Sequence, residues 1–384
     1  MIRPLIAQFL RRLAPFSQLE HPREIVRQFT PNWFAATMGT GILALALPLV
    51  PDAGPLLRQA GEGLWLFNIG LFTLFTGLYA ARWMLFGQEA RRIFGHSVVS
   101  MFIGTIPMGL ATIINGVLVF GLPRWGEGMI PVAQALWWID IALSLGCGVL
   151  IPYLMFTRQE HRIDQMTAVW LLPVVAAEVA AVSGGLLAPH LADAQAQFVT
   201  LIASYVLWAY SVPVAFAILP ILVLRMALPK LPHASMAASS WLALGPIGTG
   251  ALGLLILGTE APSILAAQGM ASAGLVAAGI GVIAGTLLWG FGLWWLLLAS
   301  LITIRYFRAG VPFNLGWWGY TFPLGVYTVA TLKLGELYGL GFFSGLGTLL
   351  VVALALMWLL VTARTLHGGW KGHLFVSPCI AAPQ

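Results

Sequence analysis

The feature that most constrains this chain is a series of ten apolar runs, each about as long as a helix that spans a lipid bilayer. A spanning helix needs about 20 predominantly apolar residues. The runs lie near residues 32–50, 64–86, 97–120, 133–156, 166–188, 197–224, 237–257, 271–304, 315–334 and 341–365. Only short loops separate them, and the longest run fits a tilted span. We therefore expect one membrane domain over residues 31–366, between a basic segment at 1–30 and a tail at 367–384.

The composition excludes a soluble fold of this length. Of the 384 residues, 59% are hydrophobic and only 8% are charged, whereas a soluble domain carries about 25% charged residues. So few charges cannot cover a soluble surface of this size, so lipid must solvate much of the molecule. The predicted fold class is an all-α membrane protein, with membrane lipid as a partner.

The distribution of Lys and Arg predicts the orientation in the membrane. With the N-terminus in the cytoplasm, the cytoplasmic segments hold sixteen of the 19 basic residues, and the outer side holds only Arg58, Arg124 and Lys333. Such an excess is typical of cytoplasmic loops. Removing or adding one span midway destroys this partition. The partition of basic residues therefore predicts ten helices with both termini in the cytoplasm, and we expect the plasma (inner) membrane as the location.

The basic residues of the N-terminal segment do not indicate a nucleic-acid partner, because the net charge of +6 is spread over short loops. The stretch Ile2–Leu13 is amphipathic enough to lie on a membrane surface. The alternative is a disordered basic tail.

The odd-numbered runs share a Pro or Gly break roughly 6–10 residues after their cytoplasmic ends. The predicted breaks are Gly39, Gly41, Pro107, Pro173, Pro246 and Pro323. Such residues are tolerated in a spanning helix where neighbouring groups or water satisfy the freed carbonyls. A ring of helices broken at one depth would present polar backbone to a central path. We therefore predict five helical hairpins with the odd helices inside, although Pro213 and Pro220 in the sixth run fit the alternative that Pro is simply common in membrane helices.

Four stretches carry a resemblance to a known family. They are FTPNWF at 29–34 with MGTG at 38–41, GTIPMG at 104–109 with TIIN at 112–115, LGPIG at 244–248, and NLGWWGYTFP at 314–323. Over about residues 28–365 the chain resembles the tellurite-resistance/dicarboxylate transporter family, which includes fungal sulfite efflux pumps, fungal malic acid permeases and plant slow anion channels. The resemblance implies ten helices in five hairpins around a pseudo-fivefold pore, a plugging Phe on the ninth helix, and a homo-oligomer, often a trimer.

The resemblance points to Phe322 as the pore gate. This residue directly precedes Pro323, where the helix should kink, and a side chain beside a kink on an inner helix can project into the axis. The alternative is one more core aromatic between helices. Because the pore lacks fixed cations in the sequence, we expect helix ends and neutral donors to stabilise the anion. The predicted pore-lining donors are Thr37, Thr40, Asn115, Thr249 and Thr321.

Three ionisable residues fall in or near the spans. Glu178 lies about twelve residues into the fifth run, and an ionisable group at that depth is costly. We expect it to couple a proton to transport or to serve as a structural hydrogen-bonding group. Asp140 is expected at the wetted outer interface. Lys333 is expected at the outer mouth, where it draws anions or snorkels to the headgroups.

Motifs for other chemistry are weak. The stretch GTGALG at 248–253 fits G-x-G-x-x-G, but no strand precedes it, so it indicates a tightly packed pore helix and no dinucleotide cofactor. No His pair has metal-ligand spacing, and no metal or other cofactor is expected. The predicted function is transport of a small anion, either a sulfite-like inorganic anion or a C4-dicarboxylate such as malate. The alternatives are a proton-coupled dicarboxylate carrier, a sensor or scaffold and, remotely, an intramembrane enzyme.

Overall fold

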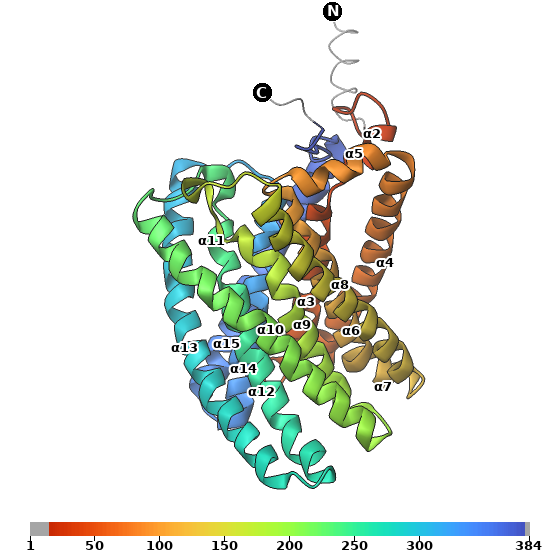
Figure 1. The fold of residues 1–384 in the computed structure, drawn as a ribbon, viewed down its shortest axis with the longest axis vertical. Helices are drawn as coiled ribbons and strands as arrows, with labels where there is room; N and C mark the ends of the chain where they lie inside the picture. Colours follow the sequence, from red (N-terminus) through yellow and green to blue (C-terminus); the bar gives the residue numbers. More distant parts are fainter. Residues whose placement is uncertain (1–14, 381–384) are drawn as a thin grey trace, which may run out of the picture.

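The computed structural model describes residues 15–380 (Figure 1). Within this part every regular element is a helix, which confirms the predicted all-α fold. The expected surface helix at Ile2–Leu13 lies outside the described residues, as do the last four residues of the tail.

Nine helical segments within residues 15–380 are long and apolar enough to cross a membrane. They are Pro31–Leu49, Pro55–Leu85, Val99–Trp125, Met129–Thr157, Ala168–His190, Ala194–Ala227, Ala234–Ala267, Ala271–Ala309 and Gly341–Lys371. Each overlaps one of the ten predicted runs. The chain is therefore a multi-pass membrane protein.

The remaining predicted run, the ninth at 315–334, is present but interrupted. It consists of a 3-10 helix, η10 (Leu315–Tyr320), and the α-helix α14 (Phe322–Tyr338), with Thr321 between them. α14 alone has 17 residues. The two ends of the described chain meet at one end of the molecule, where the Phe16 amide donates to the Trp370 carbonyl at 2.6 Å. Because termini on one side require an even number of crossings, the split helix completes ten.

Burial divides the helices into an inner and an outer set. The inner helices are α3 (Ala35–Ala46), α6 (Thr105–Gly116), α9 (Leu172–Leu187), α12 (Leu244–Ala267) and α14. The outer helices are α4 (Pro55–Leu85), α8 (Met129–Thr157), α10 (Ala194–Ala227), α13 (Ala271–Ala309) and α15 (Gly341–Lys371). In the first four inner spans, 83–94% of the most apolar stretch is buried, against 17–39% in the outer spans. The outer helices therefore leave most of their apolar surface exposed on the outside of the ring.

The inner helices form a closed ring. They contact one another in the order α3, α6, α9, α12 and α14, and α14 returns to α3. Each inner helix also packs against the outer helix that follows it in the chain, which makes five helical hairpins (Figure 1). The odd-numbered spans are thus the inner ones, as the sequence predicted. A pseudo-fivefold relation among the hairpins stays a prediction.

Glycine allows the ring to close tightly. A Cβ on Gly104, just before α6, would lie 2.3 Å from the carbonyl oxygen of Leu172 at the start of α9. A Cβ on Gly109 would lie 2.3 Å from the Thr37 hydroxyl on α3. Both separations are far below van der Waals contact, so a side chain at Gly104 would displace the backbone at the start of α9, and one at Gly109 would displace the Thr37 side chain.

Most inner segments begin with a 3-10 turn and then become α-helical. The turns are η1 (Pro31–Phe34), η4 (Val99–Gly104), η7 (Ala168–Leu171) and η10, while the short helix α11 (Ser239–Leu242) precedes α12. Pro107, Pro173, Pro246 and Pro323 all fall within the first three residues of the α-helical part. Proline fits there because the first-turn amides have no intrahelical partner to lose.

The first inner segment differs from the prediction. α3 runs without interruption through Gly39 and Gly41, and the backbone changes instead at the junction of Phe34 and Ala35. The two glycines serve close packing: a Cβ on Gly39 would lie 2.2 Å from the Thr321 hydroxyl, and one on Gly41 would lie 2.0 Å from the Thr112 hydroxyl. Glycine therefore marks a helix contact here and no helix break.

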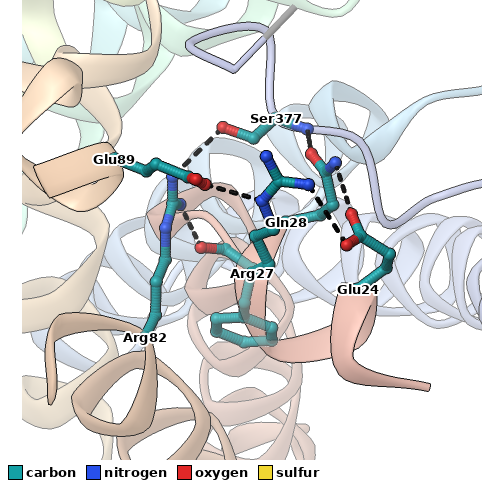
Figure 2. A network of polar contacts seen from close by, with 7 residues as sticks. Glu24, Arg27, Gln28, Arg82, Glu89 and Ser377 are labelled. Carbon is teal, nitrogen blue, oxygen red and sulfur yellow. Dashed lines mark hydrogen bonds and ion pairs between the residues drawn. The ribbon is translucent and has the colours of Figure 1, made fainter. Parts of the chain in front are cut away.

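A polar network fixes the segment after α15 beside the start of the chain (Figure 2). The buried guanidinium of Arg82 on α4 donates to the Phe29 carbonyl and, at 3.2 Å, to the Ser377 hydroxyl. The Ser377 amide donates to the Gln28 side chain at 2.8 Å. These contacts place Pro378 at the rim of a cavity in the ring.

Candidate functional site

A cavity of about 320 Å³ opens at the end of the ring where the two ends of the described chain meet. We call it the terminal cavity. All five inner segments line it. Their contributions include Asn32 and Met38, Phe102 and Met108, Leu172 and Val175, Ser239 and Gly245, and Trp318 and Phe322. The lining is mostly apolar, with a few neutral polar side chains.

A second cavity of about 560 Å³ lies on the opposite side of the ring and is called the far cavity. The same five inner helices line it. Their contributions include Ile42 and Leu45, Asn115 and Val119, Val182 and Leu186, Leu252 and Ile256, and Val329 and Lys333. One ring of helices therefore encloses an open space on both sides.

A short closed zone separates the two cavities. On three inner helices the deepest lining residues of the two cavities are seven positions apart: Met108 and Asn115, Val175 and Val182, and Gly245 and Leu252. The separation is six positions on α14, from Pro323 to Val329, and four on α3, from Met38 to Ile42. Four to seven residues make about one to two helical turns. The zone between the cavities is therefore about one to two turns deep.

Phe322 lies where the terminal cavity meets this closed zone. It is the first residue of α14, its side chain is 3% exposed, and it lines the cavity. The interruption at Thr321 and the first-turn Pro323 set the direction in which α14 leaves the 3-10 turn. The position fits the predicted gate. Gating itself stays a prediction.

Three of the five predicted pore-lining residues, Thr37, Thr40 and Thr321, line neither cavity. The Thr37 and Thr321 hydroxyls donate to the carbonyls of Phe34 and Trp318, each at 2.7 Å, and both side chains are fully buried. The Thr40 hydroxyl accepts a hydrogen bond from the Trp358 indole of α15 at 3.0 Å. The first two hydroxyls are therefore bound within their own segments, and the Thr40 hydroxyl joins α3 to α15.

The other two predicted donors, Asn115 and Thr249, lie near the path between the two cavities. Asn115 lines the far cavity, and its side-chain oxygen is buried without a hydrogen-bond partner. Thr249 lies on α12 between Gly245 and Leu252, within the closed zone, and its hydroxyl is also buried and unpaired within the described residues. Thr249 is thus a neutral polar group inside the barrier.

Glu178 is fully buried on α9 and lines neither cavity. Both of its carboxyl oxygens lack a hydrogen-bond partner among residues 15–380. The hydroxyl of Ser211 on α10 faces the carboxyl without completing a hydrogen bond. The carboxyl therefore lies toward the contact of α9 with an outer helix, off the axis of the path.

Asp140 corrects the expectation of a wetted interfacial carboxylate. α8 begins at Met129, so Asp140 lies well inside the span, and its side chain is fully buried. It belongs to the buried stripe of α8 with Trp137 and Ser144, and both carboxyl oxygens lack a partner in the described chain. The sequence reading failed because it started this span four residues too late and could not tell which face of α8 packs inward.

Lys333 lines the far cavity, where its ammonium group pairs with the Glu336 carboxylate of the same helix at 3.1 Å. The pair is partly exposed and brings no net charge to the mouth. Among the described lining residues of both cavities, His96 is the only other titratable side chain. Sequence reading missed His96 as a cavity residue. The only available signal was its place immediately before the third run.

The backbone adds a favourable field for anions in the terminal cavity. All five inner helices run in the same direction, with their N-terminal ends at this cavity. A helix N-terminus carries roughly half a positive charge from aligned peptide dipoles. Five parallel N-termini therefore raise the potential at the terminal cavity without any Lys or Arg in its lining.

Comparison with known proteins agrees with this architecture. A family model described as the voltage-dependent anion channel, SLAC1, matches residues 28–366. The chain belongs to this family. The match spans the whole ring and its outer helices.

Individual relatives of the voltage-dependent anion channel family cover most of the chain. A sulfite efflux pump of Arthroderma benhamiae is 37% identical over 352 residues, which is 91% of this chain and 93% of the relative. An uncharacterized transporter of Methanocaldococcus jannaschii is 28% identical and covers 93% of this chain and 98% of its own length. A malic acid transport protein of Schizosaccharomyces pombe is 25% identical and covers 88% of this chain and 77% of its own length.

Proposed function

We propose that this protein carries small anions across a membrane along the axis of the inner ring. The observation that carries the proposal is the pair of cavities, one on each side, lined by the same five helices and separated by about one to two helical turns. A path with one short barrier needs only a local rearrangement to conduct. Relatives named as sulfite efflux and malic acid transport proteins support an anion as cargo.

A sulfite-like inorganic anion is the preferred substrate, and a C4-dicarboxylate such as malate is the second. The sulfite-pump relative is the more similar of the two named transporters, at 37% against 25% identity. The terminal cavity suits a small anion because its donors are neutral and five helix N-termini face it. An anion held without a fixed counter-charge leaves as readily as it enters.

Orientation, gating and assembly complete the proposal. The terminal cavity faces the cytoplasm of the plasma (inner) membrane, and residues 31–366 form the transport domain. Phe322 closes the path where the terminal cavity ends, because its ring is large, apolar and offers an anion no hydrogen bond. The protein assembles as a homo-oligomer, a trimer, through its lipid-facing helices.

A proton-coupled carrier is the second candidate mechanism. The buried carboxyl of Glu178 favours it, because an unpaired carboxyl within a membrane span is costly unless it holds a proton. The remote alternative, an intramembrane enzyme, has no support from the relatives, which are named as transport proteins. A sensor or scaffold would have the same helices without flux.

Reconstituted flux tests the proposal. Purified protein in liposomes should release sulfite, and more slowly malate, down a concentration gradient, whereas protein-free liposomes should retain both. A channel should conduct without a proton gradient, and a coupled carrier should accelerate when one is imposed. Liposomes that retain every small anion tested would contradict the transport proposal.

A further inference from the structure

His96 contributes a polar atom to the terminal cavity that none of the contacts described above uses. It lies in the loop just before η4, and its half-buried side chain lines the cavity. The other lining residues carry no charge, and no Asp, Glu, Lys or Arg is among them. Any side-chain recognition of an anion here therefore depends on neutral donors and on this imidazole.

One imidazole nitrogen, Nδ1, stabilises a backbone turn. Nδ1 accepts hydrogen bonds from the backbone amides of Val98 at 3.1 Å and Val99 at 3.3 Å, which fixes the turn that leads into η4. A nitrogen that accepts from two amides carries no proton, so the ring proton resides on Nε2. Burial also lowers the pKa of His96 below its ordinary value of 6.5, which favours the neutral ring.

The second imidazole nitrogen, Nε2, can donate a hydrogen bond to a ligand. Within residues 15–380, Nε2 has no hydrogen-bond partner, and it carries the ring proton. Charged groups lie near but outside the cavity: Glu160, His161 and Arg162 line a separate small hollow that shares Val98 and Val169 with it. The donor is therefore a neutral N–H on the ring of a cavity-lining residue.

Most other polar side chains of the cavity are already occupied. The Thr105 hydroxyl donates to the carbonyls of Pro31 and Phe102, and the Asn314 amide donates to the Ser235 carbonyl. Asn32 and Ser239 also line the cavity. No hydrogen bond joins the Asn32 Nδ2 or the Ser239 hydroxyl to another group in the described part of the chain, and the Asn32 Oδ1 is buried without a partner as well. Three donors from three different inner segments therefore remain for a ligand.

We propose that the Nε2–H of His96 binds the transported anion in the terminal cavity, with Asn32 and Ser239 as companion donors. The inference rests on the proposed function and assigns the position at which the transported anion first binds. A neutral N–H attracts an oxyanion, which accepts hydrogen bonds, and offers a cation no acceptor. Because the donor has no formal charge, it selects the anion without trapping it.

Two substitutions separate the two imidazole nitrogens. In His96→Asn, the side-chain oxygen occupies the position of Nδ1 and retains the acceptor for the turn, but the Nε2 donor is lost. In His96→Gln, the amide nitrogen reaches the position of Nε2 and retains the donor, but the acceptor at Nδ1 is lost. A purely structural His96 should tolerate Asn better than Gln, and a ligand-binding His96 should tolerate Gln better than Asn.

The measurements are sulfite binding in detergent by calorimetry and the concentration dependence of sulfite flux in liposomes. His96→Asn should raise Kd and KM by about two- to tenfold, the loss of one hydrogen bond, with maximal flux and melting temperature kept. His96→Gln should stay within about twofold of wild type in Kd. A wild-type Kd in a folded His96→Asn protein, or an equal loss in both variants, would overturn the assignment.

The binding measurement separates this inference from the proposed function. A protein that binds sulfite through His96 but shows no flux would contradict transport and support the binding position. A protein with flux and no effect of His96→Asn on Kd or KM would support transport and overturn the binding position.

Discussion

At the scale of single residues, Phe322 and Phe102 allow a matched test of the gate. Both line the terminal cavity, but only Phe322 lies against the closed zone, since Phe102 precedes the deepest α6 lining residue, Met108, by six positions. Phe322→Ala should raise anion conductance because it removes the ring from the barrier. Phe102→Ala widens the cavity without shortening the barrier and should leave conductance near wild type. Conductance in planar bilayers and a thermal melt in detergent measure the two effects.

A loss of conductance in Phe322→Ala would identify Phe322 as a core aromatic that supports the fold. Truncation of a buried Phe typically costs about 3–5 kcal/mol of stability. A Phe322→Ala protein that melts at lower temperature and conducts less than wild type would rule out the gate.

Glu178 gives a second test at this scale. Glu178→Gln keeps the shape of the side chain and removes its titration, so a proton-coupled carrier should lose acid-driven uptake and retain anion exchange. Asp140→Asn is the control, because Asp140 is also fully buried but belongs to an outer helix. Uptake is measured in liposomes with and without an inward proton gradient. Unchanged acid stimulation in Glu178→Gln would leave Glu178 as a structural group.

At the scale of helices, the tight contact of α6 with α9 depends on one glycine. Gly104→Ala would place a Cβ 2.3 Å from the backbone oxygen of Leu172 and 3.0 Å from the Pro173 Cα. Backbone atoms at a helix start cannot rotate away, so we expect a loss of about 1–3 kcal/mol, typical of overpacking. Gly70→Ala on α4 is the control, because nothing lies within 4 Å of its Cβ position.

The comparison is a pair of thermal melts in the same detergent. Gly104→Ala should melt below wild type, and Gly70→Ala should match or slightly exceed it, since Ala favours helix over Gly by up to about 1 kcal/mol. Equal melting temperatures for the two variants would show that the ring tolerates separation of α6 from α9.

At the scale of the whole molecule, ten crossings with cytoplasmic termini, as proposed, predict which loops face the outside. Single cysteines at Arg91, Arg162 and Arg308 should resist an impermeant thiol reagent applied to intact cells, and one at Gly126 should react. The native thiols are replaced first, because Cys379 is partly exposed. Labelling of the Arg162 position from outside would contradict the ten-helix topology, because it would place the loop between α8 and α9 on the wrong side.

The sequence by itself determined the number of spans, the inner and outer alternation and the family. The length of an apolar run and the excess of basic residues in a loop are local properties of the sequence. Because a backbone in lipid must satisfy its hydrogen bonds within its own segment, an apolar run of this length forms a helix. The four prolines predicted as helix breaks lie in the first α-helical turn of the inner helices, where a missing amide N–H costs no intrahelical bond. Even the split ninth helix could be counted, because its apolar run is continuous through Thr321.

Only the tertiary structure decided where side chains point. Thr37 and Thr40 share α3 with the cavity residue Met38, but their hydroxyls bond a carbonyl and an outer-helix indole. Asp140 proved buried, and His96 proved to line the terminal cavity. These outcomes depend on the rotation of each helix about its axis and on contacts between residues distant in the chain. A hydrophobicity pattern that is apolar on nearly every face of the inner helices contains no information about that rotation.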